Sequence, residues 1–181
     1  MSQKKEKRLA HLFDATQCVG CSACVVACAQ VNYPDLLEGE NSGWAWLPAN
    51  IRKATVERAR RPVQILVQCQ QCEDAPCVKV CPFGANVVDP ETGMVKTDPD
   101  RCVGCGYCVT ACPYDVRWMH PKTGLPVKCM GEGCEELVRN GELPACVSVC
   151  PVHARSFGDI NDENSEISRR IASSRCEKIL P

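Results

Sequence analysis

The stretch Cys102-Val103-Gly104-Cys105-Gly106-Tyr107-Cys108-Val109-Thr110-Ala111-Cys112-Pro113 holds four cysteines separated by two, two and three residues and followed by a proline. Three further runs vary this pattern. One lacks the proline, one has two extra residues before its third cysteine, and the last is stretched to gaps of four, eleven and three residues. The four runs are Cys18, Cys21, Cys24, Cys28; Cys69, Cys72, Cys77, Cys81; Cys102, Cys105, Cys108, Cys112; and Cys129, Cys134, Cys146, Cys150. Sixteen of the 17 cysteines therefore belong to one repeated pattern.

The spacing is typical of a protein that ligates 4Fe-4S cubes, in which the fourth cysteine of a run serves a different cube. A tight loop of three thiolates can reach three irons, while the cysteine four residues later starts on the far side of a helical turn. Small residues such as Gly104 and Gly106 let backbone N–H groups approach the cluster sulfurs. Four runs of four ligands predict four clusters and about 16 iron atoms.

Two other uses of dense cysteine fit the pattern less well. A disulfide scaffold is typical of short secreted chains, but the cysteine count is odd and the charged stretch Met1–Arg8 shows no secretory signal. Structural zinc commonly uses two C-x-x-C pairs around one ion, not triplets followed by a fourth cysteine. Cys176 is interpreted as a free thiol without a role. The histidines are interpreted as surface or packing residues: His11, His120 and His153.

Composition and charge limit the kinds of core and of binding partner that this sequence can have. Leu, Ile, Val and Phe supply only 39 of 181 residues, close to the level at which a purely apolar core becomes doubtful, so we expect the clusters to replace part of the core and metal binding to be coupled to folding. A net charge of -1 gives no global case for nucleic acid or an anionic membrane. The best apolar run, Val63–Val67, is far too short to span a bilayer.

The sequence also repeats itself outside the cysteines. Val88–Lys96 resembles Met119–Lys128, and each reads as a hairpin that turns at proline and glycine. Short helices are predicted after Cys24, Cys77, Cys108 and Cys146. Strands are predicted over Leu9–Asp14, Val63–Gln68, Ala85–Asp89, Met94–Thr97, Val116–His120 and Ala154–Phe157. The predicted class is α+β: a duplicated bacterial ferredoxin-like fold of two dicluster lobes, with short helices, short hairpins, an inserted loop and a C-terminal tail.

Two segments lie outside this repeat. The insertion 32–62 carries Trp44, Trp46 and a basic stretch; it is either a loop that packs its tryptophans over a cluster or a docking surface for a partner. In the tail, Asp162 or Asn164 can cap a helix that we expect to pack on the body. Asp115 and Arg117 are interpreted as charges on the lobe surface.

Four such runs in 181 residues, with the segments CEDAPCVKVCP, CPYDVRWMHP, PACVSVCP and ARSFGDI, resemble the iron-sulfur subunit of the dimethyl sulfoxide reductase family of molybdopterin oxidoreductases. Polysulfide and thiosulfate reductase subunits look closest, and the resemblance covers Leu9–Ile160. It implies an electron-transfer subunit without catalytic residues. It also implies two partners, a large molybdenum or tungsten bis-pterin catalytic subunit and often an integral membrane quinone-reactive subunit.

The resemblance further implies how the runs combine. The ligand sets would be Cys18, Cys21, Cys24 and Cys150; Cys28, Cys129, Cys134 and Cys146; Cys69, Cys72, Cys77 and Cys112; and Cys81, Cys102, Cys105 and Cys108. One lobe would comprise residues 9–62 and 118–160, the other residues 63–117, with a tail at 161–181. The fourth run departs from the family, because Cys129 to Cys134 is two residues longer than the usual C-x-x-C; its glycines could accommodate the longer loop.

Two alternatives stay open. One is a polyferredoxin of a soluble formate, aldehyde or hydrogenase-type complex, and the other is an iron-sulfur redox sensor or carrier, which normally needs only one labile cluster. We expect the protein in the cytoplasm or on a membrane face through a partner, and in the periplasm if it is exported with a signal-bearing catalytic subunit.

Overall fold

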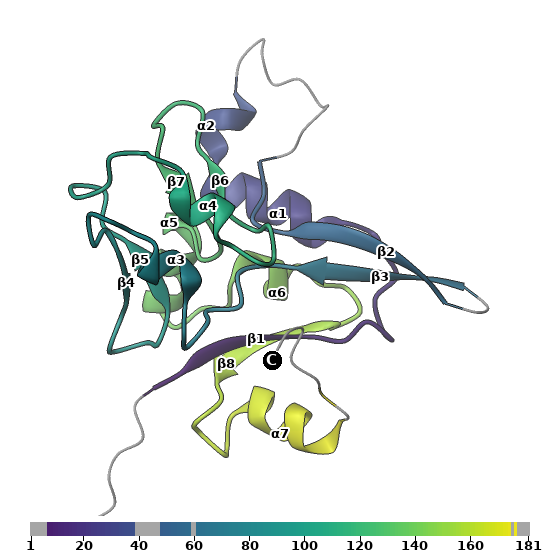
Figure 1. The fold of residues 1–181 in the computed structure, drawn as a ribbon. Helices are drawn as coiled ribbons and strands as arrows, with labels where there is room; N and C mark the ends of the chain where they lie inside the picture. The colour runs from purple at the N-terminus through teal and green to yellow at the C-terminus, as the bar shows by residue number, and fades with distance from the viewer. Residues whose placement is uncertain (1–6, 39–47, 59–60, 175, 177–181) are drawn as a thin grey trace, which may run out of the picture.

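The computed structural model describes residues 7–38, 48–58, 61–174 and 176. Within these ranges, eight short strands form four separate two-stranded antiparallel sheets, connected by loops and short helices (Figure 1). The mixed α/β architecture with short elements agrees with the sequence-based expectation. None of the helices in the described ranges is both long and apolar enough to cross a membrane.

The first sheet joins the two ends of the described part of the protein. Strand β1 (Leu9–Phe13) pairs with β8 (Arg155–Asp159), so that Leu9 lies opposite Asp159. Helix α7 (Glu166–Ser173) packs on this sheet and buries Ile167 against it, as the lower part of Figure 1 shows. The predicted tail helix is confirmed, but its cap is Ser165, whose Oγ accepts a hydrogen bond from the Ser168 N–H at 3.2 Å.

The second sheet occupies part of the segment that the sequence predicted to be an inserted loop. Strand β2 (Arg52–Arg58) pairs with β3 (Arg61–Val67) in a hairpin that extends away from the body in Figure 1. The strand expected at Val63–Gln68 is therefore present, but the part of the insertion over Arg52–Arg58 is its partner strand and not a loop. Trp44 and Trp46 lie outside the described residues.

The two remaining sheets are the hairpins expected from the internal repeat. Strand β4 (Asn86–Val88) pairs with β5 (Val95–Thr97), and β6 (Trp118–Met119) pairs with β7 (Pro126–Val127). The predicted hairpins are thus confirmed, with strands shorter than expected. Glycine serves both turns because Gly93 and Gly124 adopt φ values of 68° and 67°, in the left-handed region that L side chains rarely enter.

Each of the four cysteine runs contains the start of a short helix, which begins one residue before the third cysteine of the run. These helices are α1 (Ala23–Asn32), α3 (Pro76–Lys79), α4 (Tyr107–Thr110) and α6 (Ala145–Ser148). Two helices were not predicted, α2 (Pro34–Leu37) and α5 (Glu132–Arg139), and α5 occupies the stretched part of the fourth run.

The buried core is built partly from cysteines. Three clusters of buried residues each contain at least two of them, and none of the three is purely apolar: Cys24, Cys28 and Cys146 in one, Cys129 and Cys134 in another, Cys77 and Cys108 in the third. This placement agrees with the expectation that thiolate-bound groups supply part of the interior.

Candidate iron-sulfur centres

The four ligand sets that the resemblance implies are called quartets I to IV below, and each combines cysteines from two runs. Quartet I is Cys18, Cys21, Cys24, Cys150; quartet II is Cys28, Cys129, Cys134, Cys146; quartet III is Cys69, Cys72, Cys77, Cys112; quartet IV is Cys81, Cys102, Cys105, Cys108. Each quartet combines the first three cysteines of one run with the fourth cysteine of another. The four thiols of quartet I and those of quartet IV each line a common cavity, and in quartets II and III the thiols raise one another's pKa.

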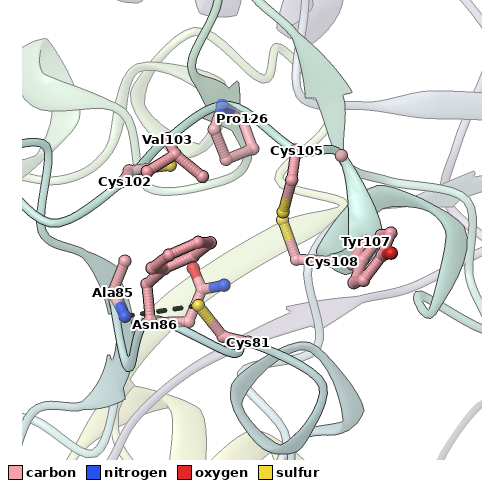
Figure 2. A pocket seen from close by; sticks show the side chains of 11 residues that line it. Cys81, Ala85, Asn86, Cys102, Val103, Cys105, Tyr107, Cys108 and Pro126 are labelled. Atoms are coloured by element: carbon pink, nitrogen blue, oxygen red, sulfur yellow. Dashed lines mark hydrogen bonds between the residues drawn. The ribbon is translucent and has the colours of Figure 1, made fainter.

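Quartets I and IV each surround a hollow in the protein. The hollow of quartet IV is lined by all four of its cysteines together with Phe83, Tyr107 and Pro126. In Figure 2 the Cys81 side chain faces Cys105 and Cys108 across this space. The hollow of quartet I is lined by its four cysteines together with Phe13 and Leu66. The two enclose about 290 and 330 Å³ of space between protein atoms, part of it open to solvent.

All four thiols of quartet II are buried, whereas quartet III has one buried thiol, Cys77, and three half-buried ones. Burial raises the pKa of the Cys28 thiol to about 12, and the nearby Cys134 and Cys146 raise it further. Burial also raises the pKa of Cys129 well above its ordinary value, with Cys146 and other thiols adding to the shift. In quartet III, burial raises the pKa of Cys72, and its three partners in the quartet add to it. Thiols crowded and buried in this way resist ionisation unless a cation binds them.

Backbone N–H groups point at cysteine sulfurs in a repeated turn. The Ala85 N–H donates to Cys81 Sγ at 3.2 Å, and the Ala154 N–H donates to Cys150 Sγ at 3.3 Å. Each donor stands four residues after its cysteine and follows a residue with positive φ, Gly84 at 59° and His153 at 49°. Figure 2 marks the first of these bonds with a dashed line. Such donors stabilise negative charge on sulfur.

The stretched opening of the fourth run is accommodated by α5. The Cys134 N–H donates to Asn32 Oδ1 at 3.1 Å, and Asn32 Nδ2 donates to Cys134 Sγ at 3.3 Å. Asn32 ends α1, so these contacts join α5 to the helix that carries Cys28. The approach requires glycine, because a Cβ on Gly133 would lie 2.1 Å from the Val31 carbonyl oxygen. The longer loop thus keeps Cys134 beside Cys28, as the sequence-based interpretation of its glycines requires.

The insertion contributes to the same quartet. Asn50 is buried, and its N–H donates to Cys28 Sγ at 3.3 Å. Its side-chain Oδ1 accepts hydrogen bonds from Tyr33 Oη at 2.7 Å and Trp118 Nε1 at 3.2 Å. Neither Asn32 nor Asn50 was identified from the sequence, because an asparagine in a linker carries no spacing signal.

Arg117 was wrongly interpreted as a surface charge. It is 1% exposed, whereas Asp115 is exposed as expected. Arg155 is also buried, and its Nη1 donates to Cys146 Sγ at 3.6 Å. A buried guanidinium without a counter-charge is costly. The thiols near Arg155 can supply that counter-charge when they are ionised.

His11 is a packing residue beside a predicted ligand. Its ring lies 4.7 Å from the Phe157 ring, and its Nε2 lies 3.8 Å from Cys129 Sγ. Burial, with a smaller effect of Arg155, lowers the pKa of His11 to about 3, so the ring is neutral. The packing interpretation holds, but the contact with Cys129 could not be read from the sequence.

The residues present fit 4Fe-4S clusters. Sulfur-directed N–H donors, hollows lined by cysteine and buried arginine nitrogens without a partner among the described residues all suit an anionic group held by four thiolates. Among the described residues, no group of three or more His, Cys, Asp or Glu side chains is arranged around a single metal ion. A cube spreads its thiolates over four irons and holds them farther apart than the ligands of one ion.

A protein of short helices and hairpins in which cysteines from different runs meet around common hollows is a ferredoxin-type protein of the dicluster class. It belongs to the 4Fe-4S dicluster domain family, which it matches over residues 64–160 and again over residues 17–85. Two dicluster domains carry four 4Fe-4S clusters, in agreement with the sequence-based expectation.

Relatives among known proteins agree with this class. The protein is 44% identical to the thiosulfate reductase electron transfer subunit PhsB of Salmonella typhi over 163 residues, which cover 87% of its own sequence and 78% of that relative. It is 39% identical to the B subunit of the polysulfide reductase of Wolinella succinogenes over 169 residues, 92% and 84% of the two sequences. It is 39% identical to protein NrfC of Escherichia coli over 171 residues, 90% and 70%. The resemblance stated from the motifs is therefore confirmed.

Proposed function

We propose that the protein is the electron-transfer subunit of a molybdopterin oxidoreductase complex. It relays single electrons along four 4Fe-4S clusters between a molybdenum or tungsten bis-pterin catalytic subunit and a quinone-reactive membrane subunit or other redox partner. Its relatives include a thiosulfate reductase electron transfer subunit and a polysulfide reductase subunit. The observation that carries the proposal is the pair of hollows in one small protein, each lined by four cysteines that come from two different runs. The protein performs no catalysis alone.

The proposed ligand sets are quartets I to IV as defined above. Cavities lined by all four members support quartets I and IV. Thiols that raise one another's pKa support quartets II and III. Because each run contributes its first three cysteines to one quartet and its last to another, neighbouring clusters share a run and lie close together.

The proposed division is into two lobes. Residues 9–62 and 118–160 form the lobe of quartets I and II, residues 63–117 form the lobe of quartets III and IV, and residues 161–181 form the tail. The boundary at 62/63 falls within β3, so the β2–β3 hairpin joins the two lobes. The pairing of β1 with β8 and the packing of α1 on α6 support the first lobe, and the packing of α3 on α4 supports the second. Contacts of Trp118 with Tyr33 and Asn50 support a boundary just before Trp118.

The bound clusters supply the one-electron redox chemistry, and the protein positions them. Its thiolates fix each cluster, its apolar side chains such as Leu66 and Phe83 line the hollows, and its N–H groups direct hydrogen bonds to sulfur. These are the levers by which a protein sets a cluster potential. No side chain needs to act as an acid, base or nucleophile.

The alternative is a subunit of a hydrogenase-type complex. The protein is 36% identical over 185 residues to the hydrogenase-2 operon protein HybA of Escherichia coli O157:H7, although the match covers only 56% of that relative. The compartment follows from the partner in either case: the cytoplasm or a membrane face, or the periplasm after export with a signal-bearing catalytic subunit.

Anaerobic purification of the native complex distinguishes the molybdopterin oxidoreductase proposal from the hydrogenase-type alternative. We expect a large subunit containing molybdenum or tungsten to co-purify with the protein, and an integral membrane protein to be present after detergent extraction. Substrate oxidised or reduced by that large subunit should change the redox state of the clusters in the electron-transfer subunit within the complex. Co-purification of nickel in place of molybdenum and tungsten would favour the hydrogenase alternative and overturn the proposal.

A further inference from the structure

Two buried arginines occupy equivalent places in the sequence. Arg117 stands five residues after Cys112 and Arg155 five residues after Cys150, so that both segments read Cys-Pro-x-x-x-Arg. The third residue after each cysteine has positive φ, 51° at Asp115 and 49° at His153, so the two turns share a backbone conformation. Arg117 is 1% exposed and Arg155 is 3% exposed. The same turn thus carries an arginine into the interior twice.

Neither arginine has a carboxylate partner among the described residues. Arg117 Nη2 donates to Asn86 Oδ1 and to Thr97 Oγ1, at 2.9 Å each. Its Nε and Nη1 are buried and have no hydrogen-bond partner in the described part of the protein. Both acceptors are neutral, so neither of them balances the positive charge of Arg117.

Arg155 has the same environment. Its Nη1 donates to Gln68 Oε1 at 2.6 Å and to Cys146 Sγ at 3.6 Å, and its guanidinium carbon lies 5.5 Å from the centre of the Phe13 ring. Its Nε and Nη2 are buried without a partner among the described residues. Arginine stays protonated in proteins, and a buried charge is retained only where an opposite charge compensates it.

The compensating charge comes from the cysteine quartets. Arg155 lies close to Cys24 of quartet I and Cys146 of quartet II, and it lowers the pKa of both thiols against the larger, opposite effect of burial. Arg117 has the same effect on Cys108 of quartet IV and, more weakly than the buried Lys128, on Cys69 of quartet III. Each arginine therefore interacts with a thiol from each of the two quartets of one proposed lobe.

We propose that Arg117 and Arg155 tune the clusters, each raising the reduction potentials of the two clusters that flank it. The proposal rests on the ligand sets proposed above. Reduction adds one negative charge to a cluster, and a fixed positive charge in a water-poor interior stabilises the reduced form more than the oxidised form. One arginine per lobe would keep the paired clusters of that lobe reducible by the same partner.

Anaerobic redox titration of the purified full-length protein, followed by electron paramagnetic resonance, tests the proposal. Arg155→Gln removes the charge and keeps a polar side chain, Arg155→Lys keeps the charge, and Arg169→Met removes an exposed arginine from α7 as a control. We expect Arg155→Gln to lower the reduction equilibrium constant of two clusters at least tenfold, which is 59 mV for a one-electron couple. Arg155→Lys should recover most of this loss, and Arg169→Met should change nothing.

The two lobes provide an internal check. Arg117→Gln should shift the two clusters that Arg155→Gln leaves unchanged. Iron and sulfide are measured on every sample, so loss of a cluster is distinguished from a shift in its potential, and no partner subunit is needed. Full iron content with equal potentials in the Gln and Lys variants would overturn the proposal. If a Gln variant loses iron, the matching Lys variant decides the question. A Lys variant that retains both the iron and the wild-type potentials supports the proposal. A Lys variant that loses as much iron as the Gln variant overturns it.

Discussion

Gly133→Ala should remove the cluster of quartet II while leaving the other three in place. A Cβ at this position would lie 2.1 Å from the Val31 carbonyl oxygen and 2.9 Å from Val31 Cγ1. The carbonyl belongs to the backbone of α1, so no side-chain rotation relieves the overlap. Helix α5 must move away from α1 by about 1 Å before the contact becomes an ordinary one. That movement separates Cys134 from Asn32 and from Cys28.

The energetic balance is clearly unfavourable. Alanine is a better helix former than glycine by about 1 kcal/mol, but an overpacked interior costs about 1–3 kcal/mol and more when the obstacle is backbone. We expect a net destabilisation of about 1–2 kcal/mol, together with weaker binding of one cluster. The iron content should fall from about 16 to about 12 per protein molecule.

Iron and acid-labile sulfide, measured on anaerobically purified protein beside a thermal melt, check this prediction. Gly141→Ala is the matched control: it lies just beyond α5, has a φ of 81° and has nothing within 4 Å of its Cβ position. It should cost about 1 kcal/mol through backbone strain and keep the full iron content. A Gly133→Ala protein with about 16 iron atoms and an unchanged melting temperature would show that α5 does not need to approach α1 this closely.

Three further outcomes are expected. Cys134→Ser should lower the iron content from about 16 to about 12 per protein molecule, whereas Cys176→Ser, outside the runs, should leave it unchanged; equal loss in both would contradict the quartets. Asn32→Ala should destabilise the protein by about 1 kcal/mol through its lost hydrogen bonds and lower the potential of one cluster, and an unaltered potential in all four would refute its contact with Cys134 Sγ. Removal of iron by a chelator should abolish most of the far-ultraviolet circular dichroism signal, because cysteines fill much of the core; a retained signal would mean that the protein folds without metal.

The short helices and the two hairpins could be predicted because each depends on residues that are close together in the sequence. The cysteine spacing located the short helices, and proline with glycine located both hairpins. The β2 strand was missed because Arg52, Lys53 and Arg58 were interpreted as part of a basic loop. Helix α5 was missed because it lies inside a cysteine run, although the Glu132–Arg139 segment has acidic residues in its first turn and an arginine in its last.

The site was only partly accessible from sequence. Spacing identified the sixteen cysteines, but spacing alone cannot say which cysteines meet, since quartet II joins Cys28 to residues 101 or more positions later. The burial of Arg117 could not be predicted, because its neighbours in sequence give no counter-charge and the thiols around it come from other runs. The contacts of Asn32 and Asn50 with sulfur likewise arise from packing between distant segments.

The content of iron and acid-labile sulfide per protein molecule, on protein isolated and kept without oxygen, tests the central claim most directly. About 16 of each per molecule, with 4Fe-4S signals by electron paramagnetic resonance after reduction, is the predicted result. Zinc in place of iron, or disulfides between the run cysteines in such a sample, would contradict it.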